Sequence, residues 1–299
     1  MSRTKHFAMR ICVIIPVYNR PDKIRRAVGS VFAQTYSPAE IIVVDDHSTD
    51  STPAVLSELS AQYLHEMVVL RHSENKGVAA ARNTGITAAS ADWIAFLDSD
   101  DEWMPEKLER QVRFHREHPE LKISQCDELW IRDGEHMTKR RIHRKEGGQI
   151  FRESLKLCLV SPSAVLMHRT LFDEIGDFDE SFPACEDYDL WLRILTEYPI
   201  GYLDEPLLTR YGGHDDQLSS RYWGMDRWRV RAMEKHLKTA IPHEWKVALY
   251  RELIEKLRIL YQGAKKREKP EAGEYRMKIS RYKHELRRLE ESESPVDNR

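Results

Sequence analysis

Three carboxylates follow a short apolar run in the first half of the sequence. Residues 93–97 have the length and composition of a buried strand, and Asp98, Asp100 and Asp101 come directly after it. Burying these charges unpaired would cost on the order of several kcal/mol each, so we expect them at the open end of the strand. Residues two apart in an extended chain face the same way, so Asp98 and Asp100 share a face and Ser99 turns away.

Asp98 and Asp100 would offer two hard oxygen ligands, with no Cys or His adjacent in the sequence. Such a pair suits Mg²⁺ or Mn²⁺ held together with a phosphate-bearing substrate. The alternative is a polar strand-to-loop turn in which an Asp acts as a cap. The stretch alone favours neither interpretation, so the decision rests on the remainder of the chain.

Two other predicted strands also end in residues that could bind a nucleotide. Residues 11–15 form an apolar run that we expect to stop at Pro16, because proline cannot continue a central strand, and Tyr18 lies in the loop that follows. Residues 40–44 end in a pair of carboxylates that includes Asp46. An aromatic ring can stack on a base, and a carboxylate can accept an imide N–H. Together with the carboxylates after residue 97, the pattern predicts a nucleoside-diphosphate site spread over several loops.

The elements that would position these residues alternate between strand and helix. Further strands are predicted at 68–70 and 93–97, and an Ala-rich helix is predicted at 78–89. This order is typical of a doubly wound α/β sheet, whose ligand crevice lies outside the carboxyl ends of the strands. No GxGxxG follows the first strand and no GxxxxGK[ST] occurs, which disfavours a dinucleotide dehydrogenase and a P-loop enzyme.

The segment after the carboxylates is predicted to contain a helix, a strand and a loop. A long amphipathic helix would begin at 103–107, with His115 and His118 as solvated residues on it. Residues 123–131 are strand-like. Residues 132–148 are interpreted as a basic, mobile excursion, for which a solvated loop is favoured over a lid on an anionic substrate.

A second acidic pair, Glu186 and Asp187, precedes an apolar helical pattern. Asp187 shares one helical face with Leu190, Trp191 and Ile194, which would direct its carboxylate toward the core side. That is an expensive place for a charge without a function. The alternative is that both acids simply complement the dipole in the first turn of a helix.

Composition and charge divide the 299 residues into two regions. The net charge of −2 combines about −9 over residues 1–225 with about +7 over residues 226–299. In the second region, apolar residues at 3–4 spacing over 247–261 and 275–289, separated by Lys269-Pro270, predict an antiparallel helical hairpin. We expect it to pack on the first region or to form a homodimer, with docking to an anionic membrane or a partner helix left open.

Cysteine usage and hydropathy predict a cytoplasmic protein. The apolar runs are too short to cross a bilayer, and the polar residues 1–9 show no signal peptide. The cysteines lie far apart without a CxxC pair, which argues against zinc and against a disulfide framework; they are Cys12, Cys126, Cys158 and Cys185. A peripheral position at the inner face of the membrane remains compatible with the basic hairpin.

Four ordered motifs resemble those of glycosyltransferase family 2, which contains inverting enzymes of the GT-A fold. They are Val13-Ile14-Ile15-Pro16-Val17-Tyr18-Asn19, Val43-Val44-Asp45-Asp46-His47-Ser48-Thr49-Asp50, Asn75-Lys76-Gly77 with Ala81-Arg82-Asn83, and Leu97-Asp98-Ser99-Asp100-Asp101. The likeness covers roughly residues 1–225. It implies a GT-A (Rossmann-like) catalytic domain with a mixed, mainly parallel sheet flanked by helices, followed by a helical extension over 226–299.

The resemblance also implies roles for individual residues. Tyr18 and Asp46 would contact the base, Asp98 the ribose and Asp100 the metal. Similar segments of the family place a histidine near the metal and diphosphate, which implies that His214 is a metal ligand and Arg210 a phosphate contact. Mixed oxygen and imidazole ligation favours Mn²⁺ over Mg²⁺. The remaining residues that the motifs assign to nucleotide-sugar binding are Pro16, Asn19, Lys76, Gly77, Arg82 and Ser99.

The expected reaction moves a sugar from a nucleotide diphosphate, UDP being favoured, to an acceptor hydroxyl with inversion. The family carries an acidic pair resembling Glu186 and Asp187, and Asp187 would be the general base. The acceptor would be a sugar or a lipid-linked glycan in surface polysaccharide synthesis, and no nucleic acid is expected. Two alternatives remain: a sugar-phosphate nucleotidyltransferase, for which the loop after the first strand offers only Arg20 as a base-rich segment, and a non-catalytic UDP-sugar-binding protein.

Overall fold

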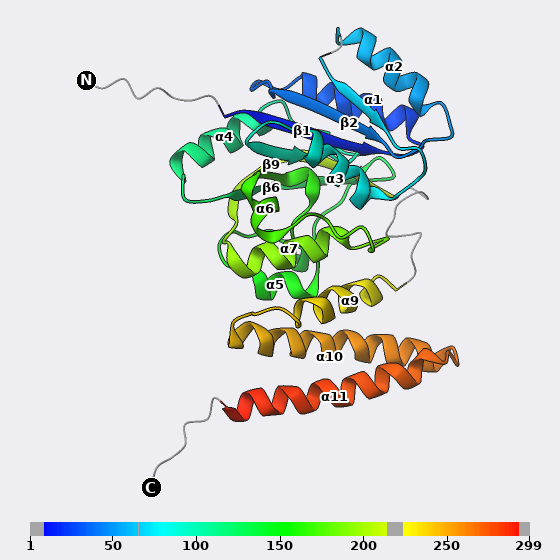
Figure 1. Cartoon of the computed structure of the whole chain (residues 1–299), viewed down its shortest axis with the longest axis vertical. Coiled ribbons are helices and arrows are strands. Elements are labelled where there is room, and N and C mark those ends of the chain that lie inside the picture. Colours follow the sequence, from blue (N-terminus) through cyan, green and yellow to red (C-terminus); the bar gives the residue numbers. More distant parts are fainter. Residues whose placement is uncertain (1–8, 65, 214–223, 293–299) are drawn as a thin grey trace, which may run out of the picture.

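A computed structural model describes residues 9–64, 66–213 and 224–292, and one mixed sheet runs through it (Figure 1). The strand order is β3-β2-β1-β4-β8-β6-β9-β5, with β7 paired to β6. Neighbours are parallel from β3 to β4 and between β6 and β9, and antiparallel elsewhere. The strands are β1 (Ile11–Val17), β2 (Glu40–Asp45), β3 (Val68–Arg71), β4 (Trp93–Phe96), β5 (Glu102–Trp103), β6 (Ile123–Arg132), β7 (Glu135–His136), β8 (Val165–His168) and β9 (Gly201–Gly212).

Two hydrophobic cores cover the two faces of the sheet. Alternate residues of β1 divide between them, since Cys12 and Ile14 belong to one core and Val13 and Ile15 to the other. Burial on both faces explains why the parallel strands are continuous apolar runs rather than alternating ones. The first core is completed by α3 (Val78–Ala88), α6 (Thr170–Ile175) and α7 (Glu186–Glu197), and the second by α1 (Pro21–Phe32), α2 (Thr52–Gln62) and α4 (Lys107–Glu117).

The predicted strands at 11–15, 40–44, 68–70 and 93–97 are all present, but the expected stop at Pro16 is wrong. β1 continues through Pro16 to Val17, whose carbonyl oxygen accepts from the Asp46 N–H on the β2 side. Alternation along the strand directs the imide nitrogen of Pro16 toward β4. There the ladder has already ended, because β4 pairs with β1 only as far as Ile14. The missing N–H therefore costs no strand hydrogen bond.

The helix expected from 103–107 begins only at Lys107, because residues 102–103 form the short strand β5 against β9. The solvated interpretation is also wrong for His115, which is 4% exposed, although it fits the exposed His118. The Nε2 atom of His115 lies 2.9 Å from Ser124 Oγ, and burial lowers the pKa of His115 to about 4. A neutral histidine thus belongs to the packing between α4 and β6.

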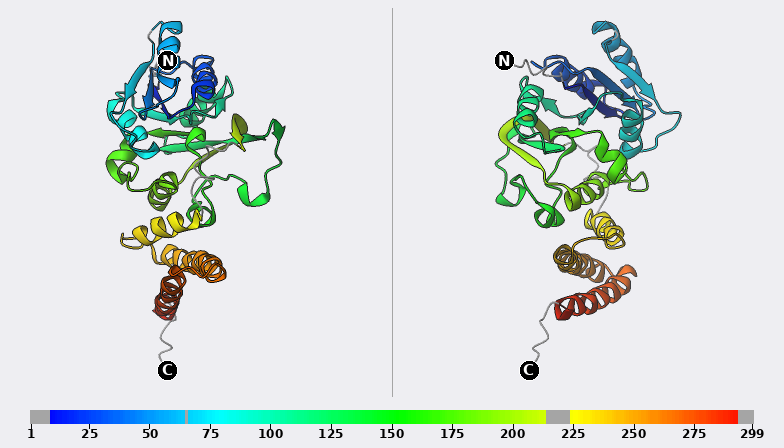
Figure 2. Two further views of the ribbon diagram at one scale, coloured as in Figure 1. Left: turned by 90° about the vertical axis from the view of Figure 1, so that its right-hand side faces the viewer. Right: turned by 60° about the vertical axis from the view of Figure 1, so that its left-hand side comes forward.

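The segment after β6 contains two short elements rather than loop alone. β7 and the 3₁₀ turn η1 (Arg141–His143) project from the body of the molecule in the left view of Figure 2. The far end of this segment returns to the body at Lys145, whose side chain is buried. A second 3₁₀ turn, η2 (Pro162–Ala164), leads into β8.

The C-terminal part is a stack of helices below the sheet (Figure 1), and the predicted antiparallel hairpin is present. α9 (Asp226–His236) packs on α7, and α10 (His243–Lys266) packs on α9 and on α5 (Phe151–Lys156). α11 (Glu271–Ser292) packs back along α10 and lies outermost. Among the described residues, no helix is both long enough and apolar enough to cross a bilayer. The division of the chain at residue 225 remains a prediction.

Candidate active site

A cleft of about 1470 Å³ opens beyond the carboxyl ends of β1, β2 and β4. One wall comes from the loops that follow these strands and from the turn before α3. The opposite wall comes from the N-terminus of α7 and the first turn of α9, with Asp187, Met225 and Trp228 among its residues. The end of β9 and residues from the β6–β7 region complete the lining. The crevice is where a doubly wound sheet places its ligand.

Asp46, at the end of β2, is held by three donors. The backbone N–H groups of Lys76 and Gly77 each donate to its carboxylate at 2.8 Å, and Nδ1 of His72 lies 2.7 Å away. Gly77 adopts φ +92°, a conformation that side chains other than hydrogen rarely allow. A carboxylate offers about four acceptor positions, so one remains for a donor in the cleft.

Tyr18 presents its ring at the cleft with 38% of its surface exposed, on a loop that is fixed from the other side. Asn19 has φ +50°, and its side-chain oxygen accepts from the Thr49 N–H at 2.8 Å. The Asn19 N–H donates to Ser48 Oγ at 2.9 Å. Asn19 therefore shapes the loop, and Tyr18 supplies the exposed flat surface.

Each carboxylate of the turn after β4 has a partner. Asp98 forms an ion pair with Arg82 at 2.8 Å, and Oδ2 of Asp100 forms one with Arg20 at 2.9 Å. Asp101 is buried and accepts from the Ser163 hydroxyl at 2.6 Å. Burial raises the pKa of Asp101 well above its usual value, helped by its acidic neighbours. Asp98 and Asp100 are thus the carboxylates of the turn that stay available as anions at the cleft.

Glu186 and Asp187 begin α7 beside the same cleft. Arg82 bridges the two walls, since its Nη1 atom lies 2.6 Å from Glu186 while its Nη2 atom binds Asp98. Burial and the charge of Asp187 raise the pKa of Glu186 to about 7, although Arg82 opposes the shift. Asp187 is half-buried, accepts from the Tyr188 N–H at 2.7 Å, and receives the Cys158 thiol at 3.5 Å.

A third acidic site lies below the cleft and was not anticipated from the sequence. Glu128 is 2% exposed and lies 3.0 Å from Lys145 and 3.3 Å from Arg210. The Ser161 hydroxyl and the Trp130 indole N–H also donate to it, at 2.6 and 2.7 Å. These partners hold the pKa of Glu128 well below its usual range despite its burial. The cluster orients Arg210, which lines the cleft.

The sequence profile of Glycosyl transferase family 2 matches residues 12–176, more than half of the chain. The chain belongs to glycosyl transferase family 2. The matched range contains the loops of one cleft wall but ends before α7, so the acidic pair at 186–187 lies outside it.

Characterised relatives carry the likeness across α7 and into the C-terminal part. The chain is 33% identical over 193 residues to the UDP-Glc:alpha-D-GlcNAc-diphosphoundecaprenol beta-1,3-glucosyltransferase WfaP of Escherichia coli, covering 62% of this chain and 70% of that protein. It is 31% identical over 216 residues to an uncharacterised glycosyltransferase of Rickettsia felis, covering 71% of this chain. The chain spans only about a third of the length of that Rickettsia protein, with 35% of it covered.

A solved structure shares the fold along nearly the whole chain. Residues 1–349 of TarS from S. aureus, crystallised in complex with UDP-GlcNAc, superpose with a TM-score of 0.68 at 20% identity. The match covers 95% of this chain and 91% of that one. The mixed α/β GT-A fold expected for a family 2 member is therefore confirmed, the C-terminal helices included.

Thirteen of the fourteen predicted site residues line the one cleft, although they come from five separate parts of the family 2 chain. Their individual roles remain predictions. His214 lies outside the described residues. The thirteen are Pro16, Tyr18, Asn19, Asp46, Lys76, Gly77, Arg82, Asp98, Ser99, Asp100, Glu186, Asp187 and Arg210.

Four cleft-side residues or groups were missed by the sequence interpretation. Arg20 stands beside the first family 2 motif, and its charge next to Asn19 was the one available signal. Cys158 and the Glu128–Lys145 pair carry no local pattern that announces their contacts. Trp228 lies in a region interpreted only as extension, yet the first turn of α9 lines the cleft.

The fit of a divalent cation rests on the turn after β4. Within residues 9–64, 66–213 and 224–292, no three side chains of His, Cys, Asp or Glu converge as a metal site. Asp98 and Asp100 nevertheless present carboxylate oxygens to a polar cleft wall. Hard oxygen donors of this kind fit a divalent cation whose other ligands are phosphate oxygens. Metal ligation by Asp100 and His214 remains a prediction.

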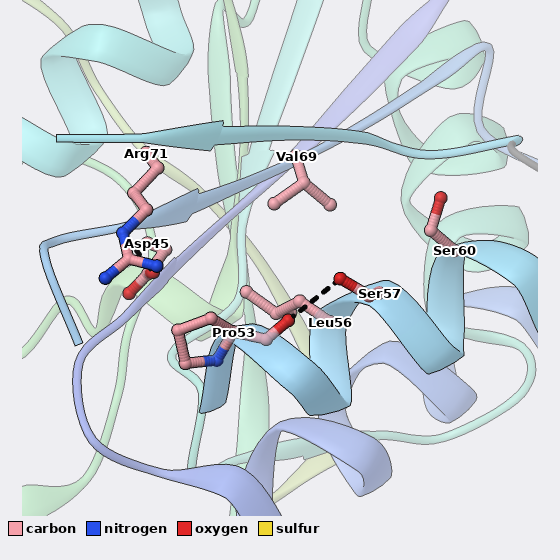
Figure 3. A pocket seen from close by; sticks show the side chains of 7 residues that line it. All are labelled: Asp45, Pro53, Leu56, Ser57, Ser60, Val69 and Arg71. Carbon is pink, nitrogen blue, oxygen red and sulfur yellow. Dashed lines mark hydrogen bonds and ion pairs between the residues drawn. The ribbon is translucent and has the colours of Figure 1, made fainter. Parts of the chain in front are cut away.

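A smaller pocket of about 380 Å³ lies on the other side of β2, between α2 and β3 (Figure 3). Asp45 points into it and pairs with Arg71 at 3.4 Å, while Leu56 and Val69 form an apolar floor. None of the predicted site residues lines it. The larger cleft is therefore the candidate active site.

Proposed function

We propose that this protein transfers a sugar from a nucleotide diphosphate, with UDP favoured, to an acceptor hydroxyl and inverts the anomeric centre. One observation carries the proposal. The carboxylates of Asp46, Asp98 and Asp100 line one wall of the cleft, and Asp187 lies on the opposite wall. A donor on the first wall would therefore have a carboxylate base across from it, as a single displacement requires.

The donor wall suits a uridine nucleotide. Tyr18 offers its ring for stacking, and the remaining acceptor position of Asp46 suits the N3–H of uracil. Asp98 would accept from ribose hydroxyls, and Arg210, oriented by Glu128, would contact phosphate oxygens. The UDP-glucose named for the E. coli relative and the UDP-GlcNAc bound by TarS support this choice.

We propose Asp100 and His214 as the protein ligands of a divalent cation, Mn²⁺ in preference to Mg²⁺, because imidazole suits transition metals better than hard cations. When bound, such a cation offsets negative charge that builds on the leaving diphosphate. Asp100 holds its position through the turn after β4, which Ser163 ties down by accepting from the Asp98 N–H and donating to Asp101.

Asp187 would take the proton from the acceptor hydroxyl. The Tyr188 N–H and the Cys158 thiol orient its carboxylate, and Glu186 is kept apart by its ion pair with Arg82. Beside Asp187 the cleft is apolar, with Met225 and Trp228 of the α9 region. Such a wall suits the apolar face of a sugar ring. The name of the E. coli relative supports a lipid-linked glycan as acceptor, and hence a peripheral position at the cytoplasmic face of a membrane.

A donor panel tests the proposal. The purified protein is incubated with UDP-glucose, UDP-GlcNAc, UDP-galactose, GDP-mannose and dTDP-glucose, each with a GlcNAc-diphospholipid acceptor, in Mn²⁺ and in EDTA. We expect one UDP-sugar to give a glycolipid product in Mn²⁺ only, with the inverted anomer by NMR. Pyrophosphate release from UTP and a sugar 1-phosphate would instead establish a nucleotidyltransferase. Binding of UDP-sugar without turnover of any acceptor or water would establish a binding protein.

A further inference from the structure

Arg20 and Asp100 form a largely buried ion pair inside the cleft. Nη1 of Arg20 lies 2.9 Å from Oδ2 of Asp100, and the two side chains are 16% and 11% exposed. The same nitrogen lies 3.4 Å from the hydroxyl of Ser99. Both residues line the cleft, so the pair lies where donor and cation would meet. Arg20 is the residue just before α1, whereas Asp100 belongs to the turn after β4.

The backbone on both sides of this pair is held in place. The Arg20 N–H donates to Thr52 Oγ1 at 2.9 Å, and its carbonyl oxygen accepts from the Ile24 N–H at 3.0 Å, which begins the hydrogen bonding of α1. On the other side, Arg26 donates to the main-chain oxygen of Asp100 at 2.8 Å. Only the Arg20 side chain can therefore move without disturbing α1 or the turn.

We propose that Arg20 competes with the divalent cation for Asp100 and exchanges the carboxylate for the diphosphate when the donor enters. The inference rests on the proposed function. Oδ2 of Asp100 is the oxygen that the guanidinium uses, and a cation bound there would lie within a few ångströms of a second positive charge. That repulsion is large in a partly buried site. The planar fork of a guanidinium matches phosphate oxygens as well as it matches a carboxylate, so a diphosphate offers Arg20 an equivalent partner.

The exchange makes cation and donor bind cooperatively. Without nucleotide, the cation has to displace Arg20 from Asp100 and leaves the guanidinium without its anion. With a diphosphate in the cleft, Arg20 keeps an anionic partner and Asp100 becomes available. By linkage, the cation must improve donor affinity by the same factor by which the donor improves cation affinity. Arg20 thus suppresses occupation of the site by cation alone.

The test measures Mn²⁺ binding by the full chain without any nucleotide. Free Mn²⁺ is followed by electron paramagnetic resonance as protein is added, for wild type and Arg20→Gln. We expect Arg20→Gln to bind Mn²⁺ about tenfold more tightly, because a charge-assisted hydrogen bond to Asp100 no longer has to be broken. In saturating Mn²⁺, calorimetry should show UDP binding to Arg20→Gln about tenfold more weakly. The two effects have opposite signs, which a general loss of structure cannot produce.

Arg25→Gln is the matched control. Arg25 lies on the same helix α1 and loses the same charge, but it pairs on the surface with Glu58 of α2. We expect Mn²⁺ affinity to change less than twofold in this variant, since exposed pairs contribute little. Asp100→Asn supplies the opposite control, because it should abolish the gain when it is combined with Arg20→Gln. Thermal melts of all variants confirm that each is folded.

Three results would overturn the inference: Arg20→Gln binds Mn²⁺ no more tightly than wild type, Arg25→Gln gains as much as Arg20→Gln, or the gain persists in the Asp100→Asn double variant. These measurements use neither sugar nor acceptor. The cation competition can therefore fail while the donor panel shows transfer. It can equally succeed in a protein for which the panel shows none.

Discussion

Glu128 and Glu186 are both almost fully buried beside the cleft, at 2% and 4% exposure, yet their acidities differ in opposite directions. Lys145, Arg210 and two neutral donors surround Glu128, and its pKa falls well below the usual range. Glu186 has only Arg82, which it shares with Asp98, and Asp187 is its immediate neighbour. Its pKa rises to about 7.

Burial opposes the charge of both glutamates, so the number of compensating partners decides the outcome. Glu128 is fully compensated and therefore locks Arg210 and the 132–148 segment in place. Glu186 is incompletely compensated because an adjacent carboxylate competes for the same region. Perturbed carboxylates of the second kind are characteristic of functional sites, whereas satisfied clusters are structural. The difference separates the residues that build this cleft from those expected to act in it.

Asp187→Asn should have the largest effect on activity. The substitution keeps the shape of the side chain but removes the base, so turnover should fall about 10²- to 10⁴-fold while UDP binding stays within about twofold of wild type. Initial rates of product formation and UDP calorimetry measure the two quantities. Near-normal turnover would transfer the role of base to Glu186 and remove the functional side of the comparison.

Lys145→Met should have the largest effect on stability. It leaves Glu128 with a half-exposed Arg210 as its only cation, and breaking a buried ion pair costs about 3 kcal/mol. Urea unfolding measures the loss. Lys122→Met is the control, since its exposed pair with Glu174 should contribute under about 1 kcal/mol. Equal losses in the two variants would show that the Glu128 cluster is not the lock described above.

Glu186→Gln should change how stability depends on pH. The native carboxyl, with a pKa of about 7, binds more protons than the unfolded one between roughly pH 4.5 and 7. The unfolding free energy of the wild type should therefore fall as pH rises through this window, by up to about 3 kcal/mol. Glu186→Gln should lack that part of the slope. Parallel curves from urea titrations at several pH values would contradict the assigned acidity.

Cys158→Ala should have the smallest effect. The thiol is a weak donor to Asp187, so its loss should lower turnover by about two- to fivefold without changing donor affinity. Cys158→Ser retains a donor and should recover most of the rate. If both variants lose activity equally, the side chain contributes packing rather than orientation of the base.

The order of the elements was readable from the sequence because it depends on short-range patterns. The strands ending at Asp45 and Phe96 are continuous apolar runs with abrupt polar ends, and parallel strands bring such ends to one edge. The hairpin of α10 and α11 followed from apolar spacing and a proline break. Errors occurred where the environment overrode the residue type. Pro16 lies within a strand whose neighbour has ended, and His115 fills a buried space between α4 and β6.

The sequence by itself determined the family, the sheet and the set of residues that meet in the cleft, since these follow from motifs and strand ends. Only the tertiary structure decided which charges pair. Arg82 bridges Asp98 and Glu186, Arg20 binds Asp100, and Glu128 receives Lys145. The reason is physical: an ion pair depends on side-chain directions and burial across separate elements, and local sequence patterns do not encode either.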